Sequence, residues 1–296
     1  MRILALGAGG MLGHKLIQRL SHDFEIAGTI RAAEADDELA AALPGVRLFG
    51  NVSAENLASV EHVLDAYRPQ AVVNCIGIIK QTAEAKDPVP SITINALFPH
   101  QLGRLCVARG ARLIHFSTDC VFSGTRGVYT EKHPPDAQDL YGRTKLLGEV
   151  TGPGCLTIRS SIIGHELRGR LGLLAWFISQ RGGRTRGFAN ALYTGLTTVA
   201  MSDLVAAALS RWPDLDGLWQ VASDPISKYD LLGIVNRVYG LGIEIDRDTD
   251  FHCDRRLDGS RFRERTGWTA PPWQTMIEAM HADHLASGAR ASRPGS

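Results

Sequence analysis

Short apolar runs alternate with amphipathic helical patterns over the first 160 residues of the chain. The apolar runs predict strands at residues 2–6, 24–30, 46–49, 71–76, 112–116 and 155–158. Apolar residues at helical spacing between them predict helices at residues 11–20, 53–67 (with Ser53 as N-cap), 91–109 and 139–150. This alternation is typical of an α/β fold, in which a parallel sheet carries helices on both faces.

The pattern becomes less regular after Arg159. Helices are expected at residues 171–180 and 201–211 and from Ser227 or Lys228 onward, with a strand at 218–221 and a basic, glycine-rich loop at 181–187. We therefore predict a first domain at residues 1–160. A smaller α+β lobe at 161–286 follows, interleaved with the first domain, and 287–296 is expected to be a frayed tail.

Composition narrows the class of protein without naming its function. The 296 residues are 44% hydrophobic, and 32 Lys and Arg against 31 Asp and Glu give a net charge of +1, which argues against disorder and against a nucleic-acid partner. No apolar run approaches the roughly 18 residues of a membrane span, and the N-terminus is unlike a signal peptide. The five cysteines form no CxxC pair, which is typical of free thiols in a reducing compartment. We expect a cytoplasmic protein without a membrane partner.

A glycine-rich segment connects the first predicted strand to the first predicted helix. Gly7 permits a tight turn, Gly10 lets the backbone approach a pyrophosphate, and Gly13 lets the helix pack closely on the strand. The helix begins with Met11 and Leu12, and its N-terminus offers free N–H groups and a positive dipole end to phosphates. These five residues predict a dinucleotide site in a Rossmann-type doubly wound sheet.

Arg31, directly after the second predicted strand, bears on which dinucleotide binds. An acidic residue here would hold the ribose hydroxyls of NAD, whereas an arginine fork can bind the 2′-phosphate of NADP. Arg31 can also be a solvated surface residue, so NAD stays open as an alternative. The sequence favours NADP as the cofactor.

Tyr141 and Lys145 are four residues apart in a predicted helix and so share one face of it. A neighbouring ammonium, together with the positive nicotinamide, would lower the pKa of the phenol toward neutrality. Ser117 and Thr118 follow the fifth predicted strand, at the edge of an open α/β sheet where ligands bind. Together with the glycine-rich segment, these side chains indicate one catalytic site.

Several of these stretches resemble the extended short-chain dehydrogenase/reductases, and most closely the dTDP-4-dehydrorhamnose reductase group. The resemblance spans roughly residues 1–165 and rests on residues 7–13, 73–77 (VNCIG), 94–96 (INA), 117–124 (STDCVFSG), 141–149 (YGRTKLLGE) and 159–164 (RSSIIG). Two features depart from the group. The aromatic residue after Ser-Thr-Asp is Cys120 here, and the segment after Gly164 differs, so the reaction type is better supported than the substrate.

The resemblance implies a catalytic set of Thr118, Tyr141 and Lys145. Tyr141 would protonate a carbonyl oxygen as hydride arrives, Lys145 would hold the nicotinamide ribose, and Thr118 would orient the same oxygen. Asn95 aligns with an asparagine behind the site, where a structural role and a proton relay are both open. Further cofactor contacts are expected from Asn51, Ile76, Gly77 and Ser117.

The segment 159–187 holds six arginines against the single acid Glu166. Arginine forks suit the diphosphate of a nucleotide sugar, although a solvated basic loop is an equal alternative. Trp176 can stack on a base, or it can belong to the core. The candidate substrate-binding residues are Ser117, Thr118, Arg168, Trp176 and Arg186. No metal is expected, since His133 and His165 have no partner at metal-ligand spacing.

The function that these observations favour is NADPH-dependent reduction of a 4-keto group on a nucleotide-linked deoxysugar, in surface polysaccharide biosynthesis. One alternative is an epimerase or dehydratase of the same fold, but such enzymes reuse a tightly held NAD, which Arg31 disfavours. Another is a non-catalytic, dinucleotide-binding regulatory subunit, which would have no need to retain Thr118, Tyr141 and Lys145. A homodimer stays open.

Overall fold

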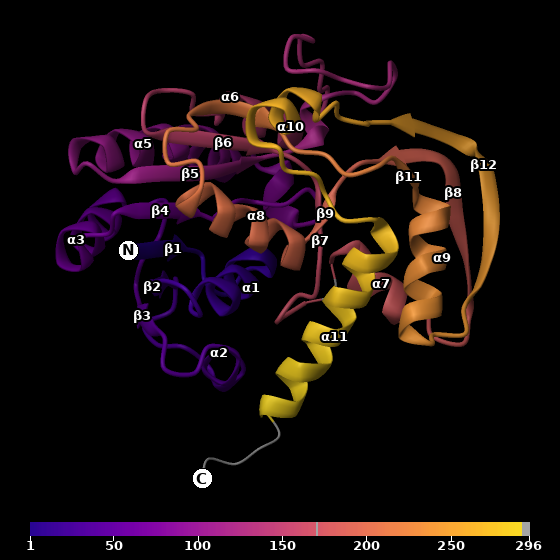
Figure 1. The fold of residues 1–296 in the computed structure, drawn as a ribbon, viewed down its shortest axis with the longest axis horizontal. Helices are drawn as coiled ribbons and strands as arrows, with labels where there is room; N and C mark the ends of the chain where they lie inside the picture. The colour runs from indigo at the N-terminus through magenta and orange to yellow at the C-terminus, as the bar shows by residue number, and fades with distance from the viewer. Residues whose placement is uncertain (170, 292–296) are drawn as a thin grey trace.

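A computed structural model describes residues 1–169 and 171–291. Within these residues, seven strands form one parallel sheet in the order β10-β6-β5-β4-β1-β2-β3 (Figure 1). The strands are β1 (Arg2–Leu6), β2 (Glu25–Thr29), β3 (Arg47–Phe49), β4 (Ala71–Asn74), β5 (Arg112–Ser117), β6 (Cys155–Arg159) and β10 (Gly217–Gln220). The α/β prediction is confirmed, and the predicted strands agree with these bounds to within two residues.

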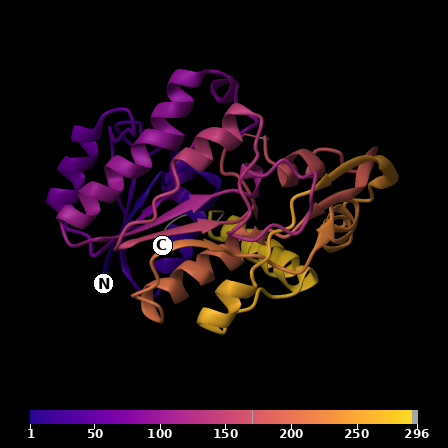
Figure 2. The same cartoon turned by 90° about the horizontal axis from the view of Figure 1, so that it is seen from above.

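Helices cover both faces of the sheet, which explains why β4 is buried along its whole length (Figure 2). One face carries the helices α1 (Met11–Leu20), α2 (Asp37–Ala42), α8 (Thr198–Ser210) and α11 (Trp273–Ala291). The other carries α3 (Leu57–Tyr67), α5 (Phe98–Ala108) and α6 (Leu140–Leu147). Each face has its own apolar core, one beneath α1 and α8 and one beneath α3 and α5.

The C-terminal part of the chain is interleaved with the first part. β10 pairs with β6 as an outer strand of the main sheet, and α8 packs against α1. The rest forms a lobe around a second sheet, in which β8 (Arg184–Tyr193) lies between β11 (Ile226–Ser227) and β12 (Glu244–Asp254). The remaining elements of this part are β7 (Ile162–Ile163), α7 (Leu173–Ile178), β9 (Leu196–Thr197), α9 (Lys228–Tyr239) and α10 (Ser260–Thr266).

Two predicted helices of the first domain differ from the structure. α3 begins after Asn56, because the hydroxyl of Ser53 accepts a hydrogen bond from the N–H of Glu55 and does not cap the helix. The helix expected at residues 91–109 is interrupted by a π-helical segment, Ile92–Leu97, before α5. A Cβ on Gly148 would lie 1.9 Å from the carbonyl oxygen of Asn95, so α6 ends in close contact with this segment.

The prediction of a loop at residues 181–187 is wrong, because β8 starts within it and pairs in parallel with β12. The tail expected from residue 287 is helical as far as Ala291, since α11 continues to that residue. Residues 292–296 lie outside the described residues.

Polar side chains connect helix α11 to α1 and to the segment that follows β7. Asp283 forms an ion pair with Lys15, and the ring of His284 stacks on that of His165, with centroids 3.7 Å apart. His165 Nε2 is 2.9 Å from the hydroxyl of Tyr239 in α9. Burial, reinforced by neighbouring His284 and Lys15, lowers the pKa of His165 to about 3.

This depressed pKa makes the stability of the fold sensitive to acid. The folded protein keeps His165 neutral, whereas the unfolded chain titrates it near pH 6.5. Above that pH the imidazole is neutral in both states and does not change the free energy of unfolding. As pH falls from 6.5 toward 3, the unfolded chain binds a proton that the folded protein does not, so the free energy of unfolding declines. His165→Phe keeps a ring but removes the titration. Between about pH 7.5 and 5, we expect the wild-type protein to lose on the order of 1–2 kcal/mol more stability than His165→Phe.

Calorimetric melting across this pH range measures the difference. A matched control is His62→Asn at an exposed histidine, which should keep the wild-type pH dependence. Equal pH dependence in wild type and His165→Phe would contradict the assignment.

Candidate active site

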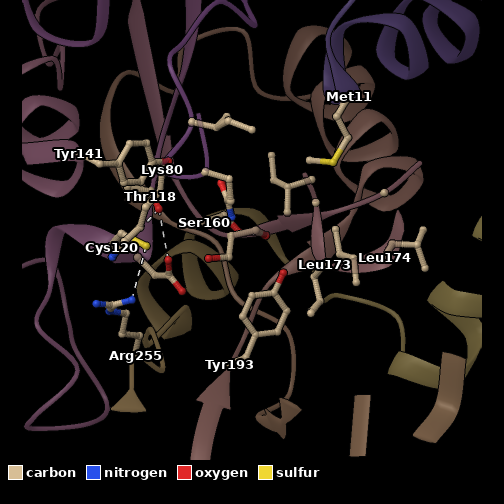
Figure 3. Close-up of a pocket in the computed structure, with 18 of the residues that line it drawn as sticks. Met11, Lys80, Thr118, Cys120, Tyr141, Ser160, Leu173, Leu174, Tyr193 and Arg255 are labelled. Carbon is tan, nitrogen blue, oxygen red and sulfur yellow. Dashed lines mark hydrogen bonds between the residues drawn. The ribbon is translucent and has the colours of Figure 1, made fainter. Parts of the chain in front are cut away.

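A cavity of about 610 Å³ opens where the carboxyl ends of β4 and β5 meet the C-terminal lobe (Figure 3). Its wall on the sheet side includes Met11 and Leu12 of α1 and the segments that follow β4 and β5. The lobe contributes residues of α7, β8, α9 and β12. The position agrees with the expectation that ligands bind at this edge of an open α/β sheet.

The structure brings Thr118, Tyr141 and Lys145 together in the lining of this cavity. Thr118 follows β5, and its hydroxyl accepts a hydrogen bond from the N–H of Cys120 at 3.1 Å. Tyr141 lies in the first turn of α6, whose start is fixed by Asp139 accepting from the N–H of Gly142 at 2.8 Å.

Burial controls the protonation of both titratable groups. It raises the pKa of the Tyr141 phenol above its ordinary value, against a smaller lowering effect of the Thr118 hydroxyl. It lowers the pKa of Lys145 to about 8, while the negative charge of Glu149 opposes the shift. For Tyr141, the nearby Cys120, Asp119 and Asp139 act in the same direction as burial, so the phenol is protonated at neutral pH. The lowering of the phenol pKa that the sequence predicts depends on the positive nicotinamide and stays a prediction for the cofactor-bound protein.

A buried ion pair lies behind these side chains. The guanidinium of Arg159 donates to both carboxylate oxygens of Glu149, at 2.9 and 2.7 Å, and the two side chains are 2% and 7% exposed. Ser117 donates to the same carboxylate at 2.6 Å. Ser117 lines the cavity as expected, and its hydroxyl proton is donated to Glu149, so its oxygen can only accept from a ligand; its contact with cofactor and substrate stays a prediction.

Gln220 of β10 extends this network. With its amide nitrogen facing the main-chain carbonyls of Tyr129 and Asp258, its oxygen accepts from Arg159 Nη1 at 3.2 Å. The ring of Phe122 lies 5.1 Å from the Arg159 guanidinium. The network thus joins β5, β6 and β10 to the segment that directly follows α6.

The glycine-rich turn fits a dinucleotide phosphate. Gly7 has φ +84°, and a Cβ on Gly13 would lie 2.1 Å from the carbonyl oxygen of Gly7, so both positions require glycine. Gly10, which precedes α1, makes no side-chain cap, and the first turn of α1 holds no acidic residue. The N–H groups at the start of α1 are therefore available to an anion.

The segment after β4 lies beside Lys145. Ile76 and Gly77 line the cavity, and a Cβ on Gly77 would be 3.3 Å from Asn95 Oδ1 and 4.0 Å from Lys145 Nζ. Asn95 uses both ends of its amide on Ile78, accepting from its N–H at 2.9 Å and donating to its carbonyl at 3.0 Å. These bonds favour the structural role for Asn95 over the relay.

Arg31 and Asn51 lie at the neighbouring part of the sheet edge, outside the cavity lining. Both are exposed. The N–H of Asn51, a residue with φ 57°, donates to the carbonyl of Ala32 at 2.9 Å, which places Asn51 beside the segment that follows β2. Both remain predicted cofactor contacts.

The predicted substrate-binding residues separate into two groups. Trp176, which is 38% exposed, and Arg186, which pairs with Asp248 at 3.4 Å, both line the cavity. Arg168 does not line it, because its guanidinium forms an ion pair with Asp36. The expectation that Arg168 contacts substrate is therefore not met by the geometry. Arg170 lies outside the described residues.

The lining residues absent from the predicted set include several of the C-terminal lobe, among them Tyr193, Lys228, Phe251 and Arg255. The ring of Phe251 lies 4.8 Å from that of Phe188, which also lines the cavity. No motif surrounds these residues in the sequence, and the one local signal is the cap Ser227 at the start of α9, which indicates a helix end but no ligand.

Two findings concern the described part of the chain as a whole. Its histidine, cysteine and acidic side chains form no group of three or more that could hold a metal ion. None of its helices is long and apolar enough to cross a membrane.

The glycine-rich turn and the Tyr141–Lys145 pair at one sheet edge define the class, which is the extended short-chain dehydrogenase/reductases. Within this class, the chain belongs to the RmlD substrate binding domain family, which matches residues 1–163.

Individual relatives resemble the first half of the chain. A probable dTDP-4,6-dihydroxy-2-methyloxan-3-one 4-ketoreductase of Streptomyces antibioticus is 37% identical over 151 residues, 50% of this chain and 45% of the relative. Methionine adenosyltransferase 2 subunit beta of Rattus norvegicus is 29% identical over 150 residues, 50% of this chain and 41% of the relative. The matched stretch thus spans less than half the length of either relative.

Solved structures extend the likeness in fold to the C-terminal lobe. The dTDP-4-dehydrorhamnose reductase of Bacillus anthracis in complex with NADP has a TM-score of 0.76 at 18% identity, covering 95% of this chain and 99% of that one. At this identity, the likeness shows the fold.

The buried ion pair gives a test of what holds the site together. Arg159→Met leaves the Glu149 carboxylate buried without its partner, so we expect a loss of about 3–5 kcal/mol in the free energy of unfolding. The double variant Arg159→Met/Glu149→Leu removes both charges and should recover most of this loss. Urea unfolding measures both. A double variant as unstable as the single one would contradict a purely electrostatic cause.

Proposed function

We propose that the protein is an NADPH-dependent reductase of a 4-keto group on a nucleotide-activated deoxysugar. The observation that carries the proposal is the convergence of Thr118, Tyr141 and Lys145 on one cavity beside a phosphate-binding turn. The name of the ketoreductase-like relative supports the reaction type.

The residues of the chain fit a nicotinamide dinucleotide, which would supply the hydride. Gly7, Gly10 and Gly13 would hold its phosphates at the start of α1, and Met11 and Leu12 would line its path into the cavity. Arg31 would bind the 2′-phosphate of NADP, with Asn51 beside it, while Ile76 and Gly77 would lie along the nicotinamide half.

Tyr141 acts as the proton donor to the carbonyl oxygen of the substrate. Its phenol is protonated at neutral pH because burial raises its pKa, and a substrate oxygen that gains negative charge draws the proton from it. Thr118 lies against Tyr141 and orients the same oxygen by a hydrogen bond.

Lys145 binds the cofactor ribose and stabilises the phenolate form of Tyr141. Its ammonium donates to the carbonyl of Phe116 at 2.6 Å, one residue before Ser117, and its remaining protons are available to a ribose hydroxyl. With a pKa of about 8, it carries its charge at neutral pH and favours the phenolate that Tyr141 becomes after proton transfer.

The other end of the cavity suits the nucleotide of the substrate. Trp176, Phe188 and Phe251 offer aromatic faces to a base, and Arg186 lies on the same side. Stacking on exposed aromatic rings stabilises a base without selecting one base strongly. The proposal therefore names a nucleotide-linked sugar and leaves the base unassigned.

The relative named as a methionine adenosyltransferase subunit supports a second candidate, a dinucleotide-binding regulatory subunit. The intact set of Thr118, Tyr141 and Lys145 favours catalysis, because regulation alone does not require a proton donor. A screen of NADPH oxidation against a panel of nucleotide 4-keto sugars separates the two. Turnover of at least one supports the reductase, whereas firm NADPH binding with no turnover of any supports the regulatory subunit.

The proton-donor assignment predicts the effect of Tyr141→Phe. Removal of the hydroxyl should lower kcat by roughly 10²- to 10⁴-fold and leave the Kd for NADPH within about twofold, since the phenol acts on the substrate oxygen. Steady-state kinetics and fluorescence titration measure the two quantities. Tyr229→Phe, outside the cavity lining, is the matched control and should keep the wild-type kcat. Near-full turnover by Tyr141→Phe would show that another group donates the proton.

The cofactor assignment predicts the effect of Arg31→Ala. Loss of the guanidinium should raise the KM for NADPH by about tenfold or more, the worth of one charge-assisted contact, and hardly change the KM for NADH. The ratio of the two constants is the readout. An unchanged ratio would remove Arg31 from the 2′-phosphate site.

A further inference from the structure

A row of three polar side chains crosses the main sheet behind the cavity. In the parallel register, Asn74 of β4 lies beside His115 of β5, and His115 lies beside Thr157 of β6. All three are at most 1% exposed. The residues two positions earlier in these strands belong to the apolar core under α3 and α5, so alternation along each strand places the row on that face of the sheet. Buried polar groups in such a core need hydrogen-bond partners.

The partners of Asn74 fix the proton of the neighbouring imidazole. Asn74 Oδ1 accepts from the N–H of Ile76 at 3.1 Å, and because a main-chain N–H can only donate, the orientation of the amide is fixed. Its Nδ2 therefore donates to Nδ1 of His115, at 3.1 Å. Since Nδ1 is the acceptor, the single proton of the neutral ring lies on Nε2.

The Nε2–H group of His115 is buried and has no hydrogen-bond partner among residues 1–169 and 171–291. Burial and the positive charge of Lys145 hold the pKa of His115 well below its ordinary value, so the ring is a neutral donor. Within the described part of the chain, the other buried side-chain nitrogen without a partner is Arg112 Nε, and that guanidinium already donates to two carbonyls. Native proteins rarely leave a buried donor unpaired, so His115 indicates an ordered water.

Lys145 approaches β5 at the same place. Its Nζ donates at 2.6 Å to the carbonyl of Phe116, the residue after His115. The ammonium and the imidazole N–H are both donors and cannot bond to each other, whereas a water oxygen can accept from both. Ser117 lies on the same face of β5, and after donating to Glu149 at 2.6 Å its oxygen can still accept from such a water.

We propose that one buried water accepts hydrogen bonds from His115 Nε2 and from Lys145 Nζ, so that His115 is a positioning residue for the ammonium. The water and the Phe116 carbonyl then take two of the three ammonium protons, and the third is directed to the cofactor. His115 itself lies outside the cavity lining. The inference rests on the proposed function, because it takes Lys145 to bind the ribose of a nicotinamide dinucleotide.

The pH dependence of NADPH binding tests this role without a sugar substrate. Charged Lys145 binds the ribose more strongly than the neutral amine, so the Kd for NADPH should rise as pH passes the Lys145 pKa of about 8. His115→Phe removes the N–H that holds the water, and the ammonium loses an acceptor. We expect the midpoint of this rise to move to lower pH by roughly one unit, the worth of a hydrogen bond to a charged group. Fluorescence titration of NADPH at a series of pH values measures the midpoint.

Two further variants separate this role from a loss of packing. Thr157→Val is the matched control, because it removes a buried hydroxyl of the same row that donates to the carbonyl of Val150 at 2.6 Å. It should lower the melting temperature and keep the wild-type midpoint. His115→Gln keeps a side-chain N–H and should lie nearer to the wild type than His115→Phe does.

The charges around Lys145 stay in place in all three variants. Glu149, which acts to raise the Lys145 pKa, keeps its ion pair with Arg159, and His100, which acts on His115 from α5, is also retained. An unmoved midpoint in His115→Phe, or an equal movement in Thr157→Val, overturns the proposal.

Nuclear magnetic resonance of the wild-type protein examines the water directly, so this measurement does not depend on the folding of any variant. With isotope-labelled histidine, we expect the proton of His115 on Nε2 and magnetisation transfer to it from a long-lived water. A proton on Nδ1, or no transfer from water, overturns the proposal. A protein that shows this water and the shifted midpoint but reduces no nucleotide 4-keto sugar supports the inference and overturns only the proposed reaction. Failure to bind NADPH at any pH overturns both.

Discussion

The ion pair between Glu149 and Arg159 fixes the geometry on which the site depends. It has almost no contact with water, and each carboxylate oxygen accepts from the guanidinium, so displacing either side chain would leave a buried charge without its partner. Glu149 follows the end of α6, four residues after Lys145, and Ser117 precedes Thr118. The pair thereby connects the end of α6, which carries Tyr141 and Lys145, to the end of β5, after which Thr118 follows.

Local patterns were enough to predict the main sheet, because a strand buried on both faces is a run of apolar residues wherever it pairs. The pairing of β8 with β12 was missed for the opposite reason. β8 is partly exposed, begins in a segment rich in arginine and glycine, and finds its partner far along the chain. The π-helical turn at Ile92–Leu97 was also missed, since helical periodicity cannot show one extra residue in a turn.

The sequence predicted those parts of the site that depend on the spacing of residues along the chain. Tyr141 and Lys145 share a helix face by geometry, and the glycine pattern specifies its own turn. The sequence could not show which side chains contact one another in the folded protein. Ser117 turned out to face Glu149, Arg168 to pair with Asp36, and Lys228 to enter the cavity from a helix whose sequence carries no motif. A charged side chain is defined by its neighbours, and these come from segments distant in the chain.

The place of β10 in the main sheet has a consequence for synthesis. During translation, residues 1–160 leave the ribosome long before Gly217–Gln220, so β6 must wait as an open edge strand with unpaired backbone groups. Arg159 also lacks its hydrogen bond to Gln220 until β10 has been synthesised. The dinucleotide half therefore cannot mature as an independent early unit. Its final closure is delayed until about half of the C-terminal lobe has been made, and in that interval the edge of β6 can pair with other chains.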